Sequence, residues 1–140
     1  MKSFARLATL AIAALPLAAP PAIANPAPHF YPSPNAEAWQ WAATTEDGSE
    51  FYVDTWSVQD GQKGSVFFWY QLNFGQPKNE SVGARVFAIA DCAAGTMQNR
   101  QVTFFDADGQ LVGAPSNEPG RVLPENSASI MACSQSRYRN

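Results

Sequence analysis

Histidine is almost absent from this chain of 140 residues, and its scarcity excludes several classes of catalytic site. The single histidine, His29, lies in a proline-rich stretch near the N-terminus. Ser-His-Asp triads, Cys-His pairs and histidine metal centres all need an imidazole that a fold holds in place. A glycine-rich phosphate loop is missing as well. We therefore expect no catalytic residue, no metal and no cofactor.

Long apolar runs are absent beyond residue 24, so the sequence predicts no transmembrane span there. The N-terminus itself has the three parts of a secretory signal: basic Lys2 and Arg6, an apolar run over residues 7–19, and the small-residue motif Ala22-Ile23-Ala24. The run is too short to cross a bilayer comfortably. We expect residues 1–24 to be cleaved and the protein to be exported, either to the periplasm or outside the cell.

Charge is sparse, since only 15% of the residues are charged. Removal of residues 1–24 leaves 116 residues with seven basic and twelve acidic side chains, a net charge of −5. A chain of this size can bury one core. An acidic domain without a basic run is a poor candidate for binding nucleic acid or an anionic membrane. No cysteine stands at the cleavage point, so a lipid anchor is not expected either.

Cysteine occurs only twice, at Cys92 and Cys133. In an oxidising compartment an even cysteine count indicates pairing, so we expect one disulfide. Two free thiols or a metal-binding pair are the alternatives, but the wide spacing and the lack of a nearby histidine disfavour zinc. Closing a loop of about 40 residues contributes on the order of 4 kcal/mol to the free energy of unfolding.

Alternation of apolar and polar residues dominates the chain after a proline-rich stretch. Residues 25–36 predict a flexible, extended leader, and residues 37–140 predict the folded domain. Short turns without intervening helices indicate an antiparallel meander. Strands are expected at Trp39 and Trp41, at Phe51 and Val53, and over residues 65–74, 81–92, 96–105 and 110–112, with a longer loop over residues 75–80.

One helix is expected near the C-terminus, over residues 127–135. Asn126 or Ser127 is its expected N-cap. Ile130 and Cys133 are three positions apart and share the face that we expect to dock on the sheet. The predicted fold class is therefore α+β: an antiparallel β-sheet meander of about six strands, with a C-terminal α-helix packed on one face and held by the disulfide.

Tryptophan is abundant for a domain of this size, and three of these residues are candidate partner-binding side chains: Trp39, Trp41 and Trp69. Most of the aromatic side chains are expected in the core. A surplus on an exposed sheet face would bind a protein partner, or would form a homodimer through that face or an edge.

The order of several short motifs resembles the surface-adhesin protein E-like family of bacterial exported proteins. The resemblance implies an antiparallel sheet with a C-terminal helix tied to it by a disulfide. It also implies, for some members, binding of host extracellular-matrix and serum proteins. It marks no ligand-contacting residue in this chain. The motifs are Tyr52-Val53-Asp54, Trp56-Ser57-Val58, Trp69-Tyr70, Asp91-Cys92, Phe104-Phe105-Asp106-Ala107-Asp108-Gly109, Val122-Leu123-Pro124-Glu125-Asn126-Ser127 and Ala132-Cys133.

The leading functional hypothesis is an exported, non-enzymatic binding or structural module. An adhesin that binds host or matrix proteins is one alternative. A small hydrolase with two facing carboxylates is the other. Asp54 and Asp91 lie among apolar residues on expected strands, but we expect each of them to accept a strand-end hydrogen bond or to pair with Arg85 or Arg100.

Overall fold

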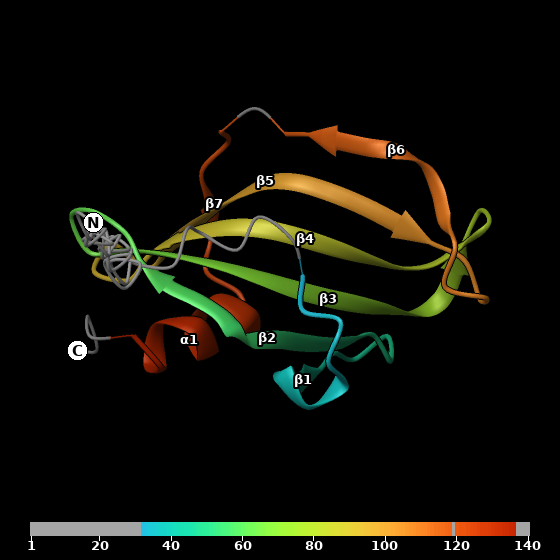
Figure 1. Cartoon of the computed structure of the whole chain (residues 1–140), viewed down its shortest axis with the longest axis horizontal. Helices are drawn as coiled ribbons and strands as arrows, with labels where there is room; N and C mark the ends of the chain where they lie inside the picture. The colour runs from blue at the N-terminus through green and yellow to red at the C-terminus, as the bar shows by residue number, and fades with distance from the viewer. Residues whose placement is uncertain (1–31, 119, 137–140) are drawn as a thin grey trace, which may run out of the picture.

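A computed structural model describes residues 32–118 and 120–136 of the chain, and in it six antiparallel strands follow one another across a single sheet (Figure 1). This confirms the predicted meander. The expected signal peptide, most of the expected leader and His29 lie outside the described residues. The strands are β1 (Trp39–Thr44), β2 (Glu50–Asp60), β3 (Ser65–Lys78), β4 (Ser81–Asp91), β5 (Thr96–Phe105) and β6 (Leu111–Asn117).

The prediction of a longer loop over residues 75–80 is wrong. β3 continues to Lys78, and only a two-residue turn precedes β4. The pairing of β3 with β4 is irregular beyond Asn73, so the extra residues form a bulge. Gly75 lies in this bulge and donates its N–H to Ser49 Oγ at 3.1 Å. A Cβ at Gly75 would lie 2.0 Å from the Asp47 carbonyl oxygen, so only glycine fits against the turn between β1 and β2.

The sheet has two further departures from the predicted boundaries. β6 extends to Asn117 rather than ending near Val112. A short strand, β7 (Leu123–Pro124), also pairs with the start of β5. Neither segment alternates clearly between apolar and polar residues, which is why the strand pattern did not indicate them.

The core lies on the face of the sheet that carries α1 (Ser127–Ser134), and we call this the helix-covered face. β4 contributes small side chains there, as predicted. The helix docks through Ala128, Ser129 and Ala132. The expected inward position of Ile130 is wrong, since its side chain is 53% exposed. Small helix residues let α1 lie close to the sheet, where most of its contacts are with β2 and β1.

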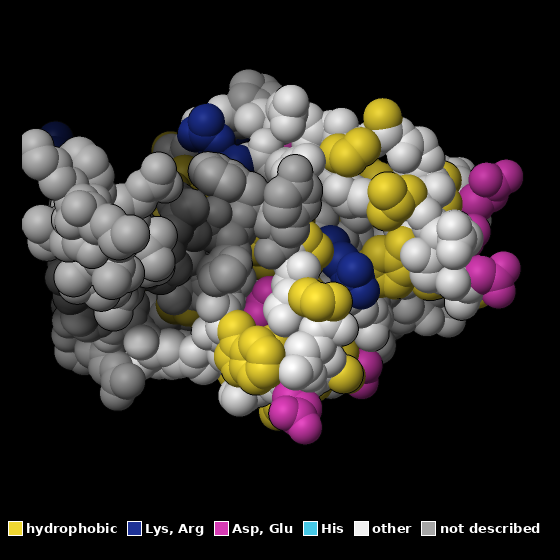
Figure 2. Space-filling view, in the orientation of Figure 1, with side chains coloured by type: hydrophobic (Ala, Val, Ile, Leu, Met, Phe, Trp, Pro, Cys, Tyr) yellow, Lys and Arg dark blue, Asp and Glu magenta, His cyan; other side chains and the backbone are white. Residues whose placement is uncertain are grey.

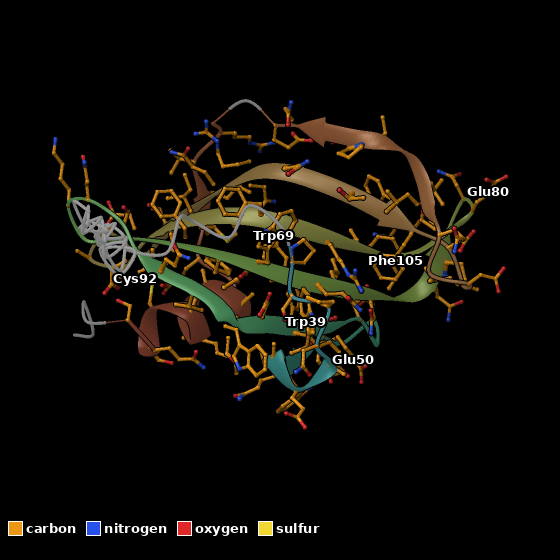
Figure 3. All side chains as sticks on the ribbon, viewed as in Figure 1. Trp39, Glu50, Trp69, Glu80, Cys92 and Phe105 are labelled. Carbon is orange, nitrogen blue, oxygen red and sulfur yellow. A yellow bond between two sulfur atoms is a disulfide. The ribbon has the colours of Figure 1, made fainter. Side chains whose placement is uncertain are left out.

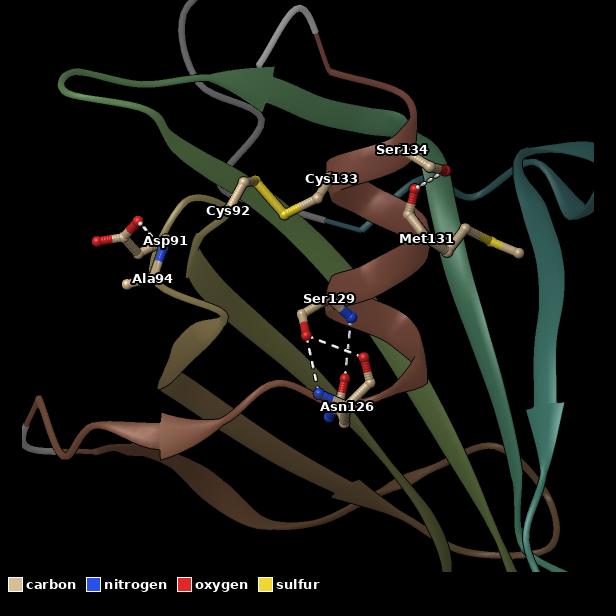
Figure 4. Close-up of a disulfide and its surroundings, with 8 residues drawn as sticks. All are labelled: Asp91, Cys92, Ala94, Asn126, Ser129, Met131, Cys133 and Ser134. Atoms are coloured by element: carbon tan, nitrogen blue, oxygen red, sulfur yellow. Dashed lines mark hydrogen bonds between the residues drawn. A yellow bond between two sulfur atoms is a disulfide. The ribbon is translucent and has the colours of Figure 1, made fainter. Parts of the chain in front are cut away.

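The disulfide between Cys92 and Cys133 is confirmed, with 5.7 Å between the two Cα atoms (Figure 4). It joins the end of β4 to the last turn of α1. Asn126 is the N-cap, as predicted. Its Oδ1 accepts from the Ser129 amide at 2.9 Å, and the Asn126 amide donates to Ser129 Oγ at 2.8 Å. This reciprocal capping box fixes where the helix begins.

The helix covers only part of its face. Its 8 residues span about 12 Å, whereas the 14 residues of β3 span about 46 Å. Beyond it, an apolar row crosses the sheet in register from Phe51 through Leu72 and Ala84 to Phe104, which is 40% exposed. Over residues 32–118 and 120–136, no helix is both long and apolar enough to cross a bilayer.

Candidate functional site

The opposite face of the sheet, which we call the open face, carries a row of polar and aromatic side chains. Side chains of directly paired residues lie on the same face of a sheet. The strand register places Trp41 beside Tyr52, Tyr52 beside Gln71, Gln71 beside Arg85, and Arg85 beside Thr103. Five strands thus contribute one residue each to a row through the middle of this face.

The segment before β1 crosses the open face and is tied to it at Ser33. The Ser33 amide donates to Asp54 Oδ2 at 2.7 Å, and the Ser33 carbonyl accepts from Trp39 Nε1 at 3.0 Å. Asn35 then caps the short 3-10 helix η1 (Ala36–Ala38), which leads into β1. Both backbone groups of Ser33 are therefore bonded to side chains of the sheet.

Arg85 is exposed at the centre of the open face and is held by contacts on several sides. Its Nε donates to Gln71 Oε1 at 2.9 Å. Its guanidinium carbon lies 5.5 Å from the ring centre of Trp39 and 5.7 Å from that of Phe105. Both distances are in the range of cation–π contacts. Trp39 is the first residue of β1 and Phe105 the last residue of β5, and both are labelled in Figure 3.

Gly83 makes the position of the Phe105 ring possible. The two residues are directly paired on β4 and β5. A Cβ at Gly83 would lie 2.4 Å from Cζ of the Phe105 ring, so the ring lies across the space that a side chain would fill. The absence of a side chain at position 83 therefore places the second aromatic ring beside Arg85.

A cavity of about 450 Å³ opens between the Ser33 segment and the sheet. This volume is in the range of small-ligand sites. Of the described residues that line the cavity, Arg85 is the one that carries a charge. Figure 2 shows this face, with a basic group near its centre bordered by hydrophobic side chains. The lining residues are Ser33, Pro34, Ala36, Trp39, Tyr52, Gln71, Asn73 and Arg85.

Two hydrogen bonds orient the polar groups around this cavity. Gln71 Nε2 donates to Asn73 Oδ1 at 2.7 Å, which leaves the Gln71 oxygen for Arg85. The Tyr52 hydroxyl donates to Glu50 Oε2 at 2.9 Å. This bond to the carboxylate raises the pKa of Tyr52, because it stabilises the protonated form of the hydroxyl.

The three tryptophans predicted to bind a partner differ in exposure. Trp41 is 56% exposed on the edge strand, and Trp39 is half-buried beside Arg85. Trp69 is only 3% exposed, and its ring lies 5.4 Å from that of Phe87. Trp69 therefore contributes to the packing of the open face, and the binding roles of Trp39, Trp41 and Trp69 stay predictions. A homodimer through this face or an edge also stays a prediction.

The two carboxylates singled out in the sequence accept backbone hydrogen bonds, which is one of the two expected outcomes. Asp54 is fully buried and accepts from the amides of Ser33 and Trp56. Asp91 accepts from the Ala94 amide at 3.0 Å. The two aspartates are not paired in the sheet register, since Asp54 lies opposite Trp69 and Asp91 opposite the start of β3. Within the described part of the chain, no group of three potential metal ligands occurs.

Another carboxylate, Asp47, lies in the turn between β1 and β2, beside a shallower hollow. It accepts from the Thr45 hydroxyl and, at 3.0 Å, from the Ser49 amide. These hydrogen bonds lower the pKa of Asp47, because they stabilise its charged form. The carboxylate therefore acts as a turn acceptor.

Sequence reasoning missed Arg85, Tyr52, Gln71 and Asn73 as site residues. It treated Arg85 only as a partner for an aspartate. One signal was available: Arg85 is the only charged residue between Ser81 and Ile89, in the middle of an otherwise apolar strand. Arginine is enriched at protein interfaces, so an exposed arginine at mid-strand is a reason to look for a partner.

Comparison with known proteins supports the fold. No family model matches the sequence, and no curated protein matches it significantly. Two solved structures of Haemophilus influenzae protein E are similar. One has a TM-score of 0.50 at 16% identity and covers 77% of this chain and 94% of that chain. The other has a TM-score of 0.49 at 19% identity and covers 78% of this chain and 92% of that chain.

At 16% identity, the likeness to the first of these structures concerns the fold alone. It agrees with the fold implied by the resemblance to the protein E-like family. Membership of that family stays a prediction.

Proposed function

We propose that this protein is an exported, non-enzymatic binding module that contacts a protein partner through the open face of its sheet. The observation that carries the proposal is the exposed Arg85 between two aromatic rings, at the edge of a cavity of about 450 Å³. Tryptophan, tyrosine and arginine are the residue types most enriched at the energetic centres of protein interfaces. Trp39, Trp41, Tyr52 and Arg85 supply all three types on one face.

Export is supported by two features of the chain. The N-terminal pattern of residues 1–24 is typical of a cleaved signal peptide. The bond between Cys92 and Cys133 is of the kind that persists in oxidising compartments. The partner would therefore be met in the periplasm or outside the cell.

Site-specific photo-cross-linking in the exporting bacterium tests the proposal. A photo-reactive amino acid is placed at position 41 on the open face or at position 130 on the outer side of α1. Trp41 and Ile130 are similarly exposed, at 56% and 53%, so position 130 is a matched control. We expect discrete cross-linked products from position 41 and none from position 130. Equal products from both positions, or none from position 41, would contradict the proposal.

Adhesion is the narrower form of this function, and the resemblance to the protein E-like family favours it. Cell fractionation discriminates the two forms. An adhesin must be found at the cell surface or in the medium, whereas a strictly periplasmic pool leaves only the broader function.

A further inference from the structure

The guanidinium of Arg85 has more donors than the fold uses. An arginine carries five N–H donors in a rigid plane. In this structure the Nε donor bonds Gln71, and the rings of Trp39 and Phe105 lie against the group. Among the described residues, no carboxylate forms an ion pair with Arg85. Within residues 32–118 and 120–136, the donors on its two terminal nitrogens therefore have no hydrogen-bond acceptor and can bind a ligand.

These donors are also held in place before any ligand arrives. Gln71 accepts from Nε because its own amide nitrogen is bonded to Asn73. Two rings restrict the guanidinium further. A group that is already ordered loses less conformational entropy when it binds. Holding an arginine side chain in one position costs conformational entropy. An arginine that only faced solvent would gain entropy by moving freely, so the ordering of Arg85 favours a binding role.

The charge of the cavity selects the class of ligand. Among the described residues that line the cavity, Arg85 alone is charged. The carboxylates of Glu50 and Asp54 adjoin the cavity through Tyr52 and Ser33, and both already accept hydrogen bonds from those residues. Arg85 therefore offers its positive charge to one further negative group. A carboxylate carries one charge and two oxygens that match the two terminal nitrogens of arginine. A phosphate group carries more charge and is usually held by several basic groups or backbone amides. The geometry and the charge therefore favour a carboxylate.

We propose that the cavity binds a peptide carboxylate, with Arg85 donating two hydrogen bonds to its oxygens. This inference rests on the proposed binding function and specifies the ligand group. Asn73 and the Tyr52 hydroxyl oxygen are placed to contact the polar backbone of the peptide, while Trp39 and Pro34 offer apolar surface. The carboxylate is either a chain terminus or the side chain of an acidic residue.

Nuclear magnetic resonance of the isotope-labelled, purified protein tests the proposal directly, because the Nε–H signal of Arg85 reports on its own guanidinium. Three probes are compared: acetyl-Ala-Ala-Ala with a free C-terminus, acetyl-Ala-Glu-Ala amide, and the neutral acetyl-Ala-Gln-Ala amide. Inorganic phosphate is the fourth probe. We expect saturable shifts of the Arg85 signal with the free acid, the glutamate peptide or both, with a Kd on the order of 1 mM or below. Whichever of these two peptides binds more tightly identifies the source of the carboxylate, a chain terminus or an acidic side chain.

Variants separate the two features of Arg85, its charge and its planar fork. Arg85→Gln removes both and is expected to weaken binding at least ~10-fold. Arg85→Lys keeps the charge but loses the fork, so it should also bind more weakly than the wild type. Arg121→Gln removes an exposed arginine that does not line the cavity and should leave the Kd unchanged. Unchanged amide spectra away from the site show that each variant is folded.

Three outcomes would overturn the carboxylate site. They are equal binding of the neutral peptide, tighter binding of phosphate than of either carboxylate, and no shift of the Arg85 signal with any probe. Cross-linking from position 41 distinguishes this failure from failure of the proposed function. If discrete cross-links persist in the Arg85→Gln variant while no peptide binds, the binding module stands and the carboxylate inference is wrong.

Discussion

The two faces of this sheet are made from the same strands but from different kinds of side chain. On β4, Ala84, Ala88 and Ala90 point to the helix-covered face, whereas Arg85 and Phe87 point to the open face. Side chains alternate between faces along a strand, so one sequence encodes both surfaces at once. A register slip of one residue would exchange them.

The difference shows how each face is completed. Small residues on the helix-covered face let α1 approach, and the disulfide then fixes it there. Large residues on the open face pack against one another instead, as Trp69 does with Phe87. The only described segment that crosses this face is the short one tied down at Ser33. One face is thus closed by a second element, and the other keeps a cavity.

The largest expected effect comes from breaking the closure of the helix-covered face. Replacing both cysteines, as in Cys92→Ser with Cys133→Ser, removes a cross-link over a sequence separation of 41. The free energy of unfolding should fall by about 4 kcal/mol, since the unfolded chain is no longer constrained. Urea unfolding measures this fall, and far-UV circular dichroism should show that the sheet persists.

The reduced wild-type protein is the control for the cysteine pair, and its unfolding midpoint should match that of the double variant. A midpoint shared by the oxidised and reduced wild type would show that the bond does not stabilise the domain.

Alkaline pH should distinguish the two faces through their tyrosines. On the helix-covered face, burial raises the pKa of Tyr70 to about 12, although its hydrogen bond to Asn99 partly opposes this shift. Tyrosine in the unfolded chain has a pKa of about 10. The stabilisation is therefore complete below pH ~10 and is lost as the pH rises toward 12, by about 2–3 kcal/mol.

The measurement is urea unfolding at several pH values between 9 and 12. Tyr70→Phe should flatten the loss of stability over this range. Tyr52→Phe, on the open face, is the matched control, because Tyr52 is exposed enough for solvent to screen its interaction with Glu50. Equal pH profiles for the Tyr70→Phe variant and the wild type would contradict this explanation.

A smaller difference is expected from changes in side-chain volume. Ala88 is fully buried on the helix-covered face, so Ala88→Leu should overpack the core and cost about 1–3 kcal/mol. Trp41 is 56% exposed on the open face, so Trp41→Ala should cost less than about 1 kcal/mol. Thermal unfolding of both variants gives the comparison. A larger loss from Trp41→Ala would mean that the open face carries more of the stability than its exposure indicates.

The sequence predicted the parts of the fold that depend on local pattern. Alternation identified β5 and all of β4, with one residue too many at the end of β4. Asn126 was recognised as a helix cap because its side chain acts within its own turn. The disulfide followed from compartment and cysteine count. These features need no knowledge of distant contacts.

The features that the sequence did not predict depend on contacts between distant segments. The extension of β3 beyond Phe74 is stabilised by Gly75 packing on a turn that lies 26 residues away. Ile130 points outward because the alanines of α1 fit the sheet more closely. The environment of Arg85 combines residues from four strands, so no single segment of sequence reveals it.

The placement of the disulfide also sets an order of events during synthesis. Cys133 follows Cys92 by 41 residues, and at the usual ~5–20 residues per second it leaves the ribosome about 2–8 s later. The chain between the two cysteines contains β5, β6 and β7, so the first four strands can pair before the second thiol exists. Oxidation can therefore close the loop only after nearly all of α1 has been made, so the bond forms late relative to the pairing of the first four strands.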